Sequence, residues 1–353
     1  MESATPQKSG IAARRPWVIW LLGFFLLILA LSVYIYSNLP KPAKRVHLIV
    51  YAFSTQEEVF TQGIFPAFEQ KWNAANEWQV TLEGVFGPAE TLAGQITLGA
   101  PADIAIFSNP QQVTWLKVSK LVSQDFIPVV IGSTPLVIVT RSGNPASLVG
   151  FADLSAANGL NLMHPDPNTS GAGEWALLAE YGSAYLASGD TAAAEAQLQG
   201  IWEQVRLLAP SARAALTLFE LGAGDALITY EQDALLAAAR GVPLEIVYPS
   251  RTVLVQPLAV LVEENITRRE REAAQAFLDF LLSAEGQNIL TRYYLRPVEG
   301  LAEGFEPLVQ PFTVEDLGGW PRAYNQMVEV FWRETIEPGL DFLPAPILLD
   351  SGD

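Results

Sequence analysis

The feature of this sequence that most constrains its fold is the alternation, from residue 46 onward, of short apolar runs with longer segments of helical period. The apolar runs predict strands at 46–53, 78–85, 103–107, 136–140, 160–164, 225–230, 244–248 and 252–262. The segments between them predict helices, among them 57–72, 91–98, 174–186, 192–207 and 268–282. This alternation is typical of an α/β fold with a largely parallel sheet.

The charge of the chain narrows the classes of partner. The 353 residues include 38 acidic and 21 basic side chains, for a net charge of −17. The first 45 residues hold six of the basic residues and one of the acidic ones, so 15 basic and 37 acidic residues follow. A surface this acidic repels nucleic-acid backbones, and we expect no nucleic-acid partner. The absence of cysteine excludes disulfides, thiolate chemistry and a lipid-modified cysteine.

An uncharged, apolar run at 17–36 precedes the α/β part. Twenty helical residues cover about 30 Å, the thickness of a bilayer's hydrocarbon core. Basic residues flank the run on both sides, and Trp17, Trp20, Tyr34 and Tyr36 lie near its ends, as interfacial aromatics do. We therefore expect a short tail at 1–16, a transmembrane signal-anchor at 17–36 and a stalk containing two prolines at 37–45. The alternative is a cleaved signal peptide, for which the run is long.

This topology predicts a single-pass protein of the cell membrane with its C-terminal domain on the extracytoplasmic face. Only about 15 residues precede the run. They leave no room for an intracellular output domain, which argues against a transmembrane receptor.

No enzyme motif is present. The chain has no GxSxG nucleophile elbow, no phosphate-binding loop and no closely spaced carboxylate pair suited to acid–base catalysis. The two histidines, His47 and His164, stand in no metal-ligand spacing. We therefore predict no catalytic residue, no metal site and no cofactor.

The segment 165–175, P-D-P-N-T-S-G-A-G-E-W, follows a predicted strand and precedes a predicted helix. Thr169 or Ser170 can cap that helix, while Gly171 and Gly173 allow a ligand to approach backbone N–H groups. The N–H groups at a helix start favour an anion without any basic side chain. An ordinary capped helix start has the same pattern, so the segment by itself leaves both interpretations open.

This segment resembles the P-N-P-x-S/T-S-G-G-A-R-W motif of the sulfate- and thiosulfate-binding proteins that serve ABC importers. Four further stretches resemble that family in order and spacing. They are 139–145 (V-T-R-S-G-N-P), 222–231 (G-A-G-D-A-L-I-T-Y-E), 283–287 (S-A-E-G-Q) with 296–297 (R-P), and 312–314 (F-T-V) with 318–320 (G-G-W). The resemblance spans about residues 46–335.

The resemblance implies a type II periplasmic-binding-protein fold of two α/β lobes, here preceded by the single transmembrane helix. Crossover strands at 133–140 and 252–262 would join the lobes. The first lobe would comprise 46–132 plus 257–353, and the second 133–256. The ligand would bind between the lobes, and the protein would catalyse nothing.

Carried over by position, the resemblance implies a ligand site made of Ser170, Gly171, Ala172, Ser211, Ala212, Tyr230, Ser54 and Ala89. Several positions depart from the family. Ala172 replaces a glycine, Tyr230 replaces an indole donor, and Ser54 and Ala89 replace an aspartate and a serine. Tyr230 is either a hydroxyl that bonds the ligand or only an aromatic wall.

The implied function is to capture a small anionic solute, sulfate or thiosulfate-like, for an ABC permease and its ATPase. We expect a monomer attached to the membrane through the N-terminal helix. Two alternatives remain open. One is a binding protein for another polar solute or organic acid, and the other is a membrane-tethered sensory module with a binding-protein fold.

Overall fold

The computed structural model describes residues 16–38, 44–300 and 302–340. The chain divides into two compact units, one up to Lys44 and one from Arg45 onward. The first contains helix α1 (Pro16–Asn38). Within the described residues, no helix combines the length and the apolarity needed to cross a membrane. The transmembrane prediction for 17–36 therefore lacks support here, and most of the predicted tail and residues 39–43 of the predicted stalk lie outside the described residues.

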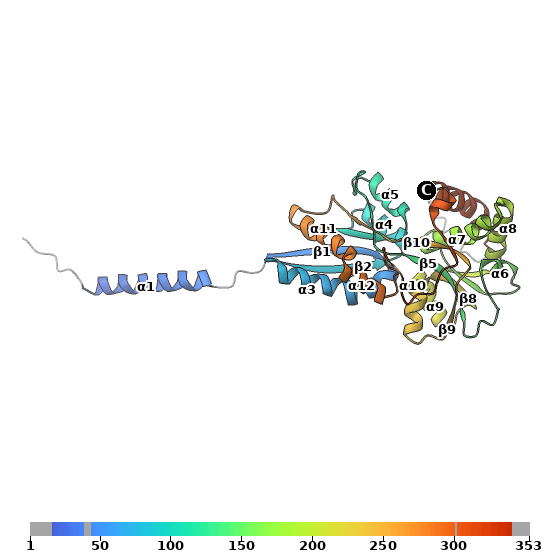
Figure 1. Ribbon diagram of the computed structural model, residues 1–353. Helices are drawn as coiled ribbons and strands as arrows, with labels where there is room; N and C mark the ends of the chain where they lie inside the picture. Colours follow the sequence, from blue (N-terminus) through green and yellow to red (C-terminus); the bar gives the residue numbers. More distant parts are fainter. Residues whose placement is uncertain (1–15, 39–43, 301, 341–353) are drawn as a thin grey trace, which may run out of the picture. The chain divides into compact units, whose positions relative to one another are not determined.

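A five-stranded sheet organises the first part of the larger unit, with the order β2-β1-β3-β11-β4 (Figure 1). Its strands are β1 (Lys44–Phe53), β2 (Trp78–Gly87), β3 (Ile104–Phe107), β4 (Val129–Val130) and β11 (Leu258–Leu261). The helical segments packed with it are η1 (Ser54–Gln56), α2 (Glu57–Val59), η2 (Phe60–Ile64), α3 (Phe65–Ala75), α4 (Ala89–Thr97), α5 (Pro110–Val118), α11 (Arg268–Leu282) and α12 (Ala284–Arg292). This sheet and these helices are called the first lobe below.

A seven-stranded sheet organises the second lobe, with the order β12-β10-β5-β8-β6-β7 and β9 paired to β5. Its strands are β5 (Thr134–Arg141), β6 (Leu162–Pro165), β7 (Val205–Ala209), β8 (Ala226–Tyr230), β9 (Leu244–Val247), β10 (Arg251–Val255) and β12 (Gln310–Phe312). Its helical segments are α6 (Phe151–Ala156), α7 (Gly171–Ser188), α8 (Thr191–Trp202), α9 (Ala212–Glu220), α10 (Glu231–Ala239), η3 (Val314–Leu317), α13 (Trp320–Tyr324), η4 (Asn325–Ile336) and η5 (Glu337–Gly339). The expected two-lobed α/β architecture is confirmed.

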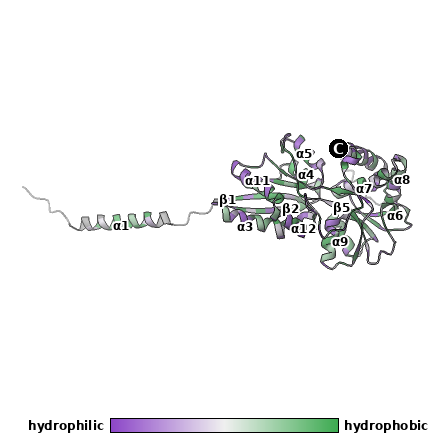
Figure 2. Cartoon of the chain, in the orientation of Figure 1, coloured by the Kyte–Doolittle hydropathy of each residue, from purple (hydrophilic) through white to green (hydrophobic). Residues whose placement is uncertain are grey.

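The core of each lobe lies between its sheet and its helices. Every residue of β3, β8 and β11 is buried, as expected for strands covered on both faces. Figure 2 shows hydrophobic residues along the strands and hydrophilic patches on the helices around them. In the first lobe, the rings of Phe60, Phe65 and Phe68 all contact the ring of Phe277 on α11. These aromatic contacts fix α11 against the helical segments that follow β1.

The sheets are mixed, so the prediction of a largely parallel sheet is only partly right. β1 and β3 are parallel, as are β6, β7 and β8 where they pair. In contrast, β11 is antiparallel to β3 and β4, and β5 is antiparallel to β8, β9 and β10. β5 and β11 are the strands that the chain enters directly from the other lobe, and each runs against its neighbours.

The chain passes between the lobes at two adjacent places and a third time further on, between α12 and β12. It leaves the first sheet after β4 and enters the second at β5, and it returns between β10 and β11. The first two passages touch each other, because the N–H of Ile131 donates to the carbonyl of Pro257 at 3.1 Å. These passages lie within or beside the crossover strands expected from the sequence.

The last part of the chain differs from the predicted lobe boundaries. The sequence predicts that residues 257–353 belong to the first lobe, but β12 pairs in parallel with β10 of the second sheet. The helical segment η4 packs on α7, and Figure 1 shows these last elements, in red, beside α7 and α8. The ring of Trp332 lies 4.5 Å from that of Trp202. Burial of these indoles draws 310–340 to the second lobe, and residues 341–353 lie outside the described part.

One predicted helix is too long. The helix expected at 192–207 ends at Trp202, and β7 begins at Val205. β7 pairs in parallel with β6, so tertiary pairing overrides the helical propensity of the alanine-rich segment at this end.

Candidate functional site: a cavity between helix starts

All eight candidate residues line one small cavity, in which the space open to the centre of a water molecule is about 10 Å³. Five further residues complete its wall: Phe53, Thr55, Gly87, Pro88 and Ser108. The wall contains residues of both lobes but no lysine or arginine. Its polar groups are therefore backbone amides and hydroxyls.

The start of α7 supplies two free amides. Asp166 shapes the turn before it, because its Oδ1 accepts from the N–H of Asn168 at 2.9 Å and its carbonyl accepts from the N–H of Ser170 at 2.9 Å. The carbonyl of Ser170 then accepts the N–H groups of Gly173 and Glu174. Within the described residues, this leaves the N–H groups of Gly171 and Ala172 without a backbone acceptor, as at other helix starts.

Two glycines are required by close packing at this start. A Cβ at Gly171 would lie 2.0 Å from Oγ of Ser108, and a Cβ at Gly173 would lie 2.5 Å from the carbonyl oxygen of Pro165. Glycine at position 171 therefore allows α7 to pack closely against the first lobe, and glycine at position 173 allows it to pack closely against its own preceding turn.

The start of α9 supplies a second pair of amides. The hydroxyl of Ser211 caps the helix by accepting from the N–H of Ala214 at 3.1 Å, and its carbonyl accepts from the N–H of Ala215 at 2.9 Å. This arrangement leaves the N–H groups of Ala212 and Arg213 unbonded within α9. Ser211 is thus a cap as well as a cavity residue.

The first lobe contributes two further helix starts. Ser54 and Thr55 belong to η1, directly after β1, and Ala89 is the first residue of α4. Together with α7 and α9, four helical segments begin at the cavity. The positive ends of their dipoles converge there, which favours an anion.

Two buried hydroxyls at the cavity lie near each other. Within the described part of the chain, neither Oγ of Ser108 nor the hydroxyl of Tyr230 has a hydrogen-bond partner of good geometry. Burial raises the pKa of Tyr230 well above its usual value, although the nearby Ser108 hydroxyl lowers it. The carboxyls of Glu90, Asp233 and Glu174 add to the rise in this pKa. The phenol therefore stays protonated, and an uncompensated buried hydroxyl is costly. Both observations favour a hydroxyl that bonds a ligand over a mere aromatic wall.

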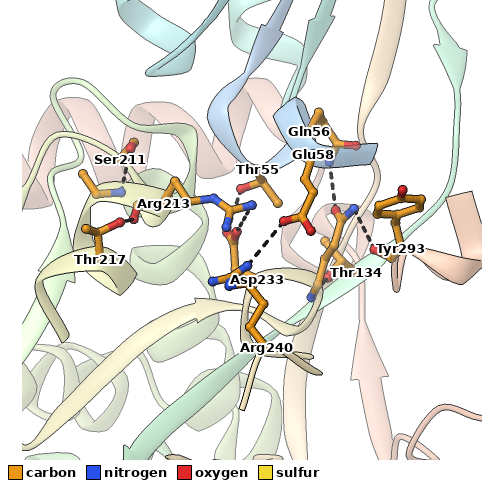
Figure 3. Close-up of polar contacts among 12 residues, drawn as sticks. Thr55, Gln56, Glu58, Thr134, Ser211, Arg213, Thr217, Asp233, Arg240 and Tyr293 are labelled. Atoms are coloured by element: carbon orange, nitrogen blue, oxygen red, sulfur yellow. Dashed lines mark hydrogen bonds and ion pairs between the residues drawn. The ribbon is translucent and has the colours of Figure 1, made fainter. Parts of the chain in front are cut away.

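A network of polar side chains joins the lobes beside the cavity (Figure 3). The hydroxyl of Thr55 donates to Oδ2 of Asp233 at 2.7 Å, and the side chain of Gln56 donates to that of Gln232 at 2.8 Å. Arg213, which follows the cavity residue Ala212, lies 3.5 Å from Asp233, and Figure 3 shows these two side chains facing each other. Thr55 and Gln56 come from the first lobe, so these contacts hold the two lobes together around the cavity.

Further from the cavity, Arg240, the residue after α10, bridges Glu58 of the first lobe and Glu220 of the second, at 3.3 and 2.7 Å. The structure therefore shows the lobes in contact. In the described residues, no group of three or more His, Asp or Glu side chains is arranged to hold a metal ion.

Sequence reasoning missed Ser108 and Thr55. Ser108 precedes Asn109, whose side chain caps α5 with Gln112 in a capping box. A buried strand followed by Ser-Asn-Pro could have signalled another helix start at the same edge of the sheet. Thr55 had no comparable local signal, because its importance comes from Asp233, 178 positions away.

Comparison with known proteins gives consistent matches. Residues 48–296 match the family model described as bacterial extracellular solute-binding protein. The chain is 29% identical to the sulfate-binding protein of Escherichia coli over 322 residues, which cover 87% of this chain and 95% of that protein. It is 31% identical to the thiosulfate-binding protein of Pseudomonas aeruginosa over 272 residues, covering 72% and 81%.

Among solved structures, the chain is similar to the sulfate-binding protein SubI of Mycobacterium tuberculosis. The TM-score is 0.73 at 25% identity, and the match covers 80% of this chain and 99% of that one.

Proposed function

The chain belongs to the bacterial extracellular solute-binding proteins, in the group that contains the sulfate- and thiosulfate-binding proteins, and from this we propose that it captures an inorganic oxyanion for an ABC importer. Members of this family bind solutes and do not convert them. The eight predicted contact residues, Ser54, Ala89, Ser170, Gly171, Ala172, Ser211, Ala212 and Tyr230, are the proposed ligand site.

One observation carries the proposal. A small cavity between the lobes is lined by the start of two helices, whose first N–H groups have no backbone acceptor, and by two buried hydroxyls, with no basic side chain in its wall. Such a wall offers donors to an anion that carries no proton of its own. Hydrogen bonds from fixed amides to an anion are stronger than bonds between neutral groups.

The size of the cavity favours an inorganic ion over an organic acid. The space inside it that the centre of a water molecule can reach is only about 10 Å³, which corresponds to roughly one water molecule. That is closer to the scale of a small inorganic ion than to that of most metabolites. Closure of the lobes, through contacts such as Thr55 with Asp233, would then bury the ion.

Sulfate or thiosulfate is expected to raise the thermal unfolding temperature of the full chain. A ligand that binds only the native state adds about 2.7 kcal/mol at 100 times Kd, which shifts the transition by a few degrees. The measurement compares sulfate, thiosulfate, molybdate, phosphate and a set of small organic acids. A shift with an organic acid and none with any oxyanion would contradict the proposal.

The proposed site of action is the extracytoplasmic face, where the solute would be passed to a permease. The sequence of 17–36 supports a retained anchor, and we expect the full-length chain to sediment with membranes and to resist extraction by alkaline carbonate. A chain that begins near residue 45 and stays in the soluble fraction would indicate cleavage instead. N-terminal sequencing of the purified protein distinguishes the two.

A further inference from the structure

Two carboxyl groups meet directly behind the cavity. Glu90 is the second residue of α4, next to the cavity residue Ala89, and Glu174 is the fourth residue of α7. The two side chains lie close enough for each to shift the pKa of the other. Glu174 is only 1% exposed. Glu90 is partly exposed as a residue, yet its Oε2 is buried and has no hydrogen-bond partner within the described residues.

The remaining contacts of this pair are neutral amides from α5. The side chain of Gln112 donates to Oε1 of Glu90. The side chain of Asn109 donates to Oε2 of Glu174 at 2.5 Å. Two carboxyls in contact and away from water cannot both be ionised without a large cost, so the pair shares at least one proton.

The charged groups on the surrounding elements do not neutralise the pair. Arg333 of η4 lowers the pKa of Glu174 only as a minor influence, and its own ion pair is with Glu329 at 2.6 Å. Other charged groups on elements packed nearby have partners of their own. Lys117 of α5 donates to the carbonyls of Gln124 and Phe126. Glu83 of β2 pairs with His47, and Asp233 of α10 bonds Thr55 and Arg213. Tyr230 and Tyr324, which also feel the charge of the pair, stay neutral because their pKa values are raised.

Burial is the main reason that the pair holds its proton. It raises the pKa of Glu90 to about 7, and it raises that of Glu174 well above its usual value, with the charge of Glu90 adding to the shift. The pair therefore changes its charge near neutral pH.

The pair is coupled to the cavity through one amide. The N–H of Gly171, which has no backbone acceptor and belongs to a cavity residue, bonds the ionised form of Glu90 and lowers its pKa. The charge of Glu90 also acts on Tyr230, another cavity residue. An ionised Glu90 and a bound oxyanion therefore compete for the same positive dipole and repel each other.

We propose, on the premise that this cavity binds an oxyanion, that the Glu90–Glu174 pair takes up a proton when the anion binds. The pair thereby makes the affinity for an anion depend on pH and on the charge of the anion. A bound dianion favours the protonated pair. Release of that proton weakens the hold on the anion.

The direction of the pH dependence follows from this linkage. Below about pH 7 the pair is already protonated in the empty protein, so affinity is nearly independent of pH. Above about pH 7 the empty protein loses the proton and must regain it on binding, so the affinity falls by up to tenfold per pH unit. Sulfate itself does not titrate in this range, so any such slope belongs to the protein.

Isothermal titration of the full chain with sodium sulfate, from about pH 6 to about pH 8.5, tests the proposal. Two buffers of different ionisation enthalpy reveal the number of protons taken up. The wild type is expected to lose affinity above pH 7 and to take up close to one proton there. In Glu90→Gln the slope and the proton uptake should disappear, and sulfate affinity near pH 8 should equal or exceed that of the wild type.

Asp103→Asn is the matched control. Burial raises the pKa of Asp103 to about 6, but its carboxyl bonds the N–H of Ile49 in the first sheet and has no contact with the cavity. This variant should keep the slope of the wild type. If Glu90→Gln does not fold, Glu90→Ala, which also removes the titrating carboxyl, should abolish the slope in the same way.

Two results overturn the proposal and differ from each other. Sulfate affinity that is constant across this pH range, or a slope that persists in the folded Glu90→Gln variant, refutes proton coupling while oxyanion binding stands. No binding of sulfate or thiosulfate at any pH refutes the proposed function itself.

Discussion

Sulfate affinity is expected to fall at least about 100-fold when Gly171 is replaced by leucine. A Cβ at this position lies 2.0 Å from Oγ of Ser108 and 3.0 Å from Nδ2 of Asn109, so the side chain must displace the hydroxyl and enter the cavity. A charge-assisted hydrogen bond contributes about 1.5–3 kcal/mol, and loss of two such bonds exceeds the roughly 2.8 kcal/mol that corresponds to 100-fold. Calorimetric titration measures the change.

Gly94→Ala is the matched control for this variant. Gly94 lies in α4, which also starts at the cavity, but a Cβ there meets nothing within 4 Å. Alanine should stabilise the helix by about 0.5–1 kcal/mol and leave the affinity unchanged. If Gly171→Leu is folded and binds sulfate as tightly as the wild type, the start of α7 is not part of the site.

Replacement of Arg296 by methionine is expected to reduce the free energy of unfolding by about 3–5 kcal/mol. The guanidinium is nearly buried and forms a bidentate pair with Glu231, with both N–O distances at 2.7 Å. It also donates to the carbonyl of Glu306 at 2.7 Å. Removal of Arg296 leaves the buried carboxylate of Glu231 unpaired, which is the costly change. Denaturant titration measures the loss.

The double variant Arg296→Met with Glu231→Gln should recover part of this stability, because no buried charge remains. Arg271→Met is the surface control. Arg271 pairs with Glu263 at 3.3 Å with both side chains partly in solvent, and such exposed pairs contribute about 1 kcal/mol or less. A change below about 1 kcal/mol in Arg296→Met would show that solvent or another group compensates the charge.

The part of the site that could be predicted from the sequence is the part formed by one continuous segment of the chain. The turn 165–171 and the start of α7 could be anticipated because a strand, a Ser-Gly turn and a helix follow one another without interruption. Convergence of this segment with Ser54, Ala89, Ser211 and Tyr230 could not be derived from spacing, since the sheets bring them together. Only the family resemblance supplied it, and one cavity in the structure contains all of them.

Other features of the structure could not be predicted from local sequence patterns. β12 is three residues long. Its pairing with β10 depends on the tertiary packing of the segment around Trp332. The contact between Glu90 and Glu174 joins residues 84 positions apart, each of which is an ordinary acidic residue in the first turn of a helix. Such contacts can be recognised only when the three-dimensional positions of both helix starts are known.

The interleaving of the two lobes sets the order in which this chain can fold during its synthesis. β11, which lies between β3 and β4, is made only after the whole of the second lobe's central sheet, and β12 is made later still. A nascent chain that ends at residue 257 therefore lacks the strand that joins β4 to the first sheet. The first lobe therefore cannot complete its sheet before β11 is made, and the second lobe cannot complete its own before β12 is made.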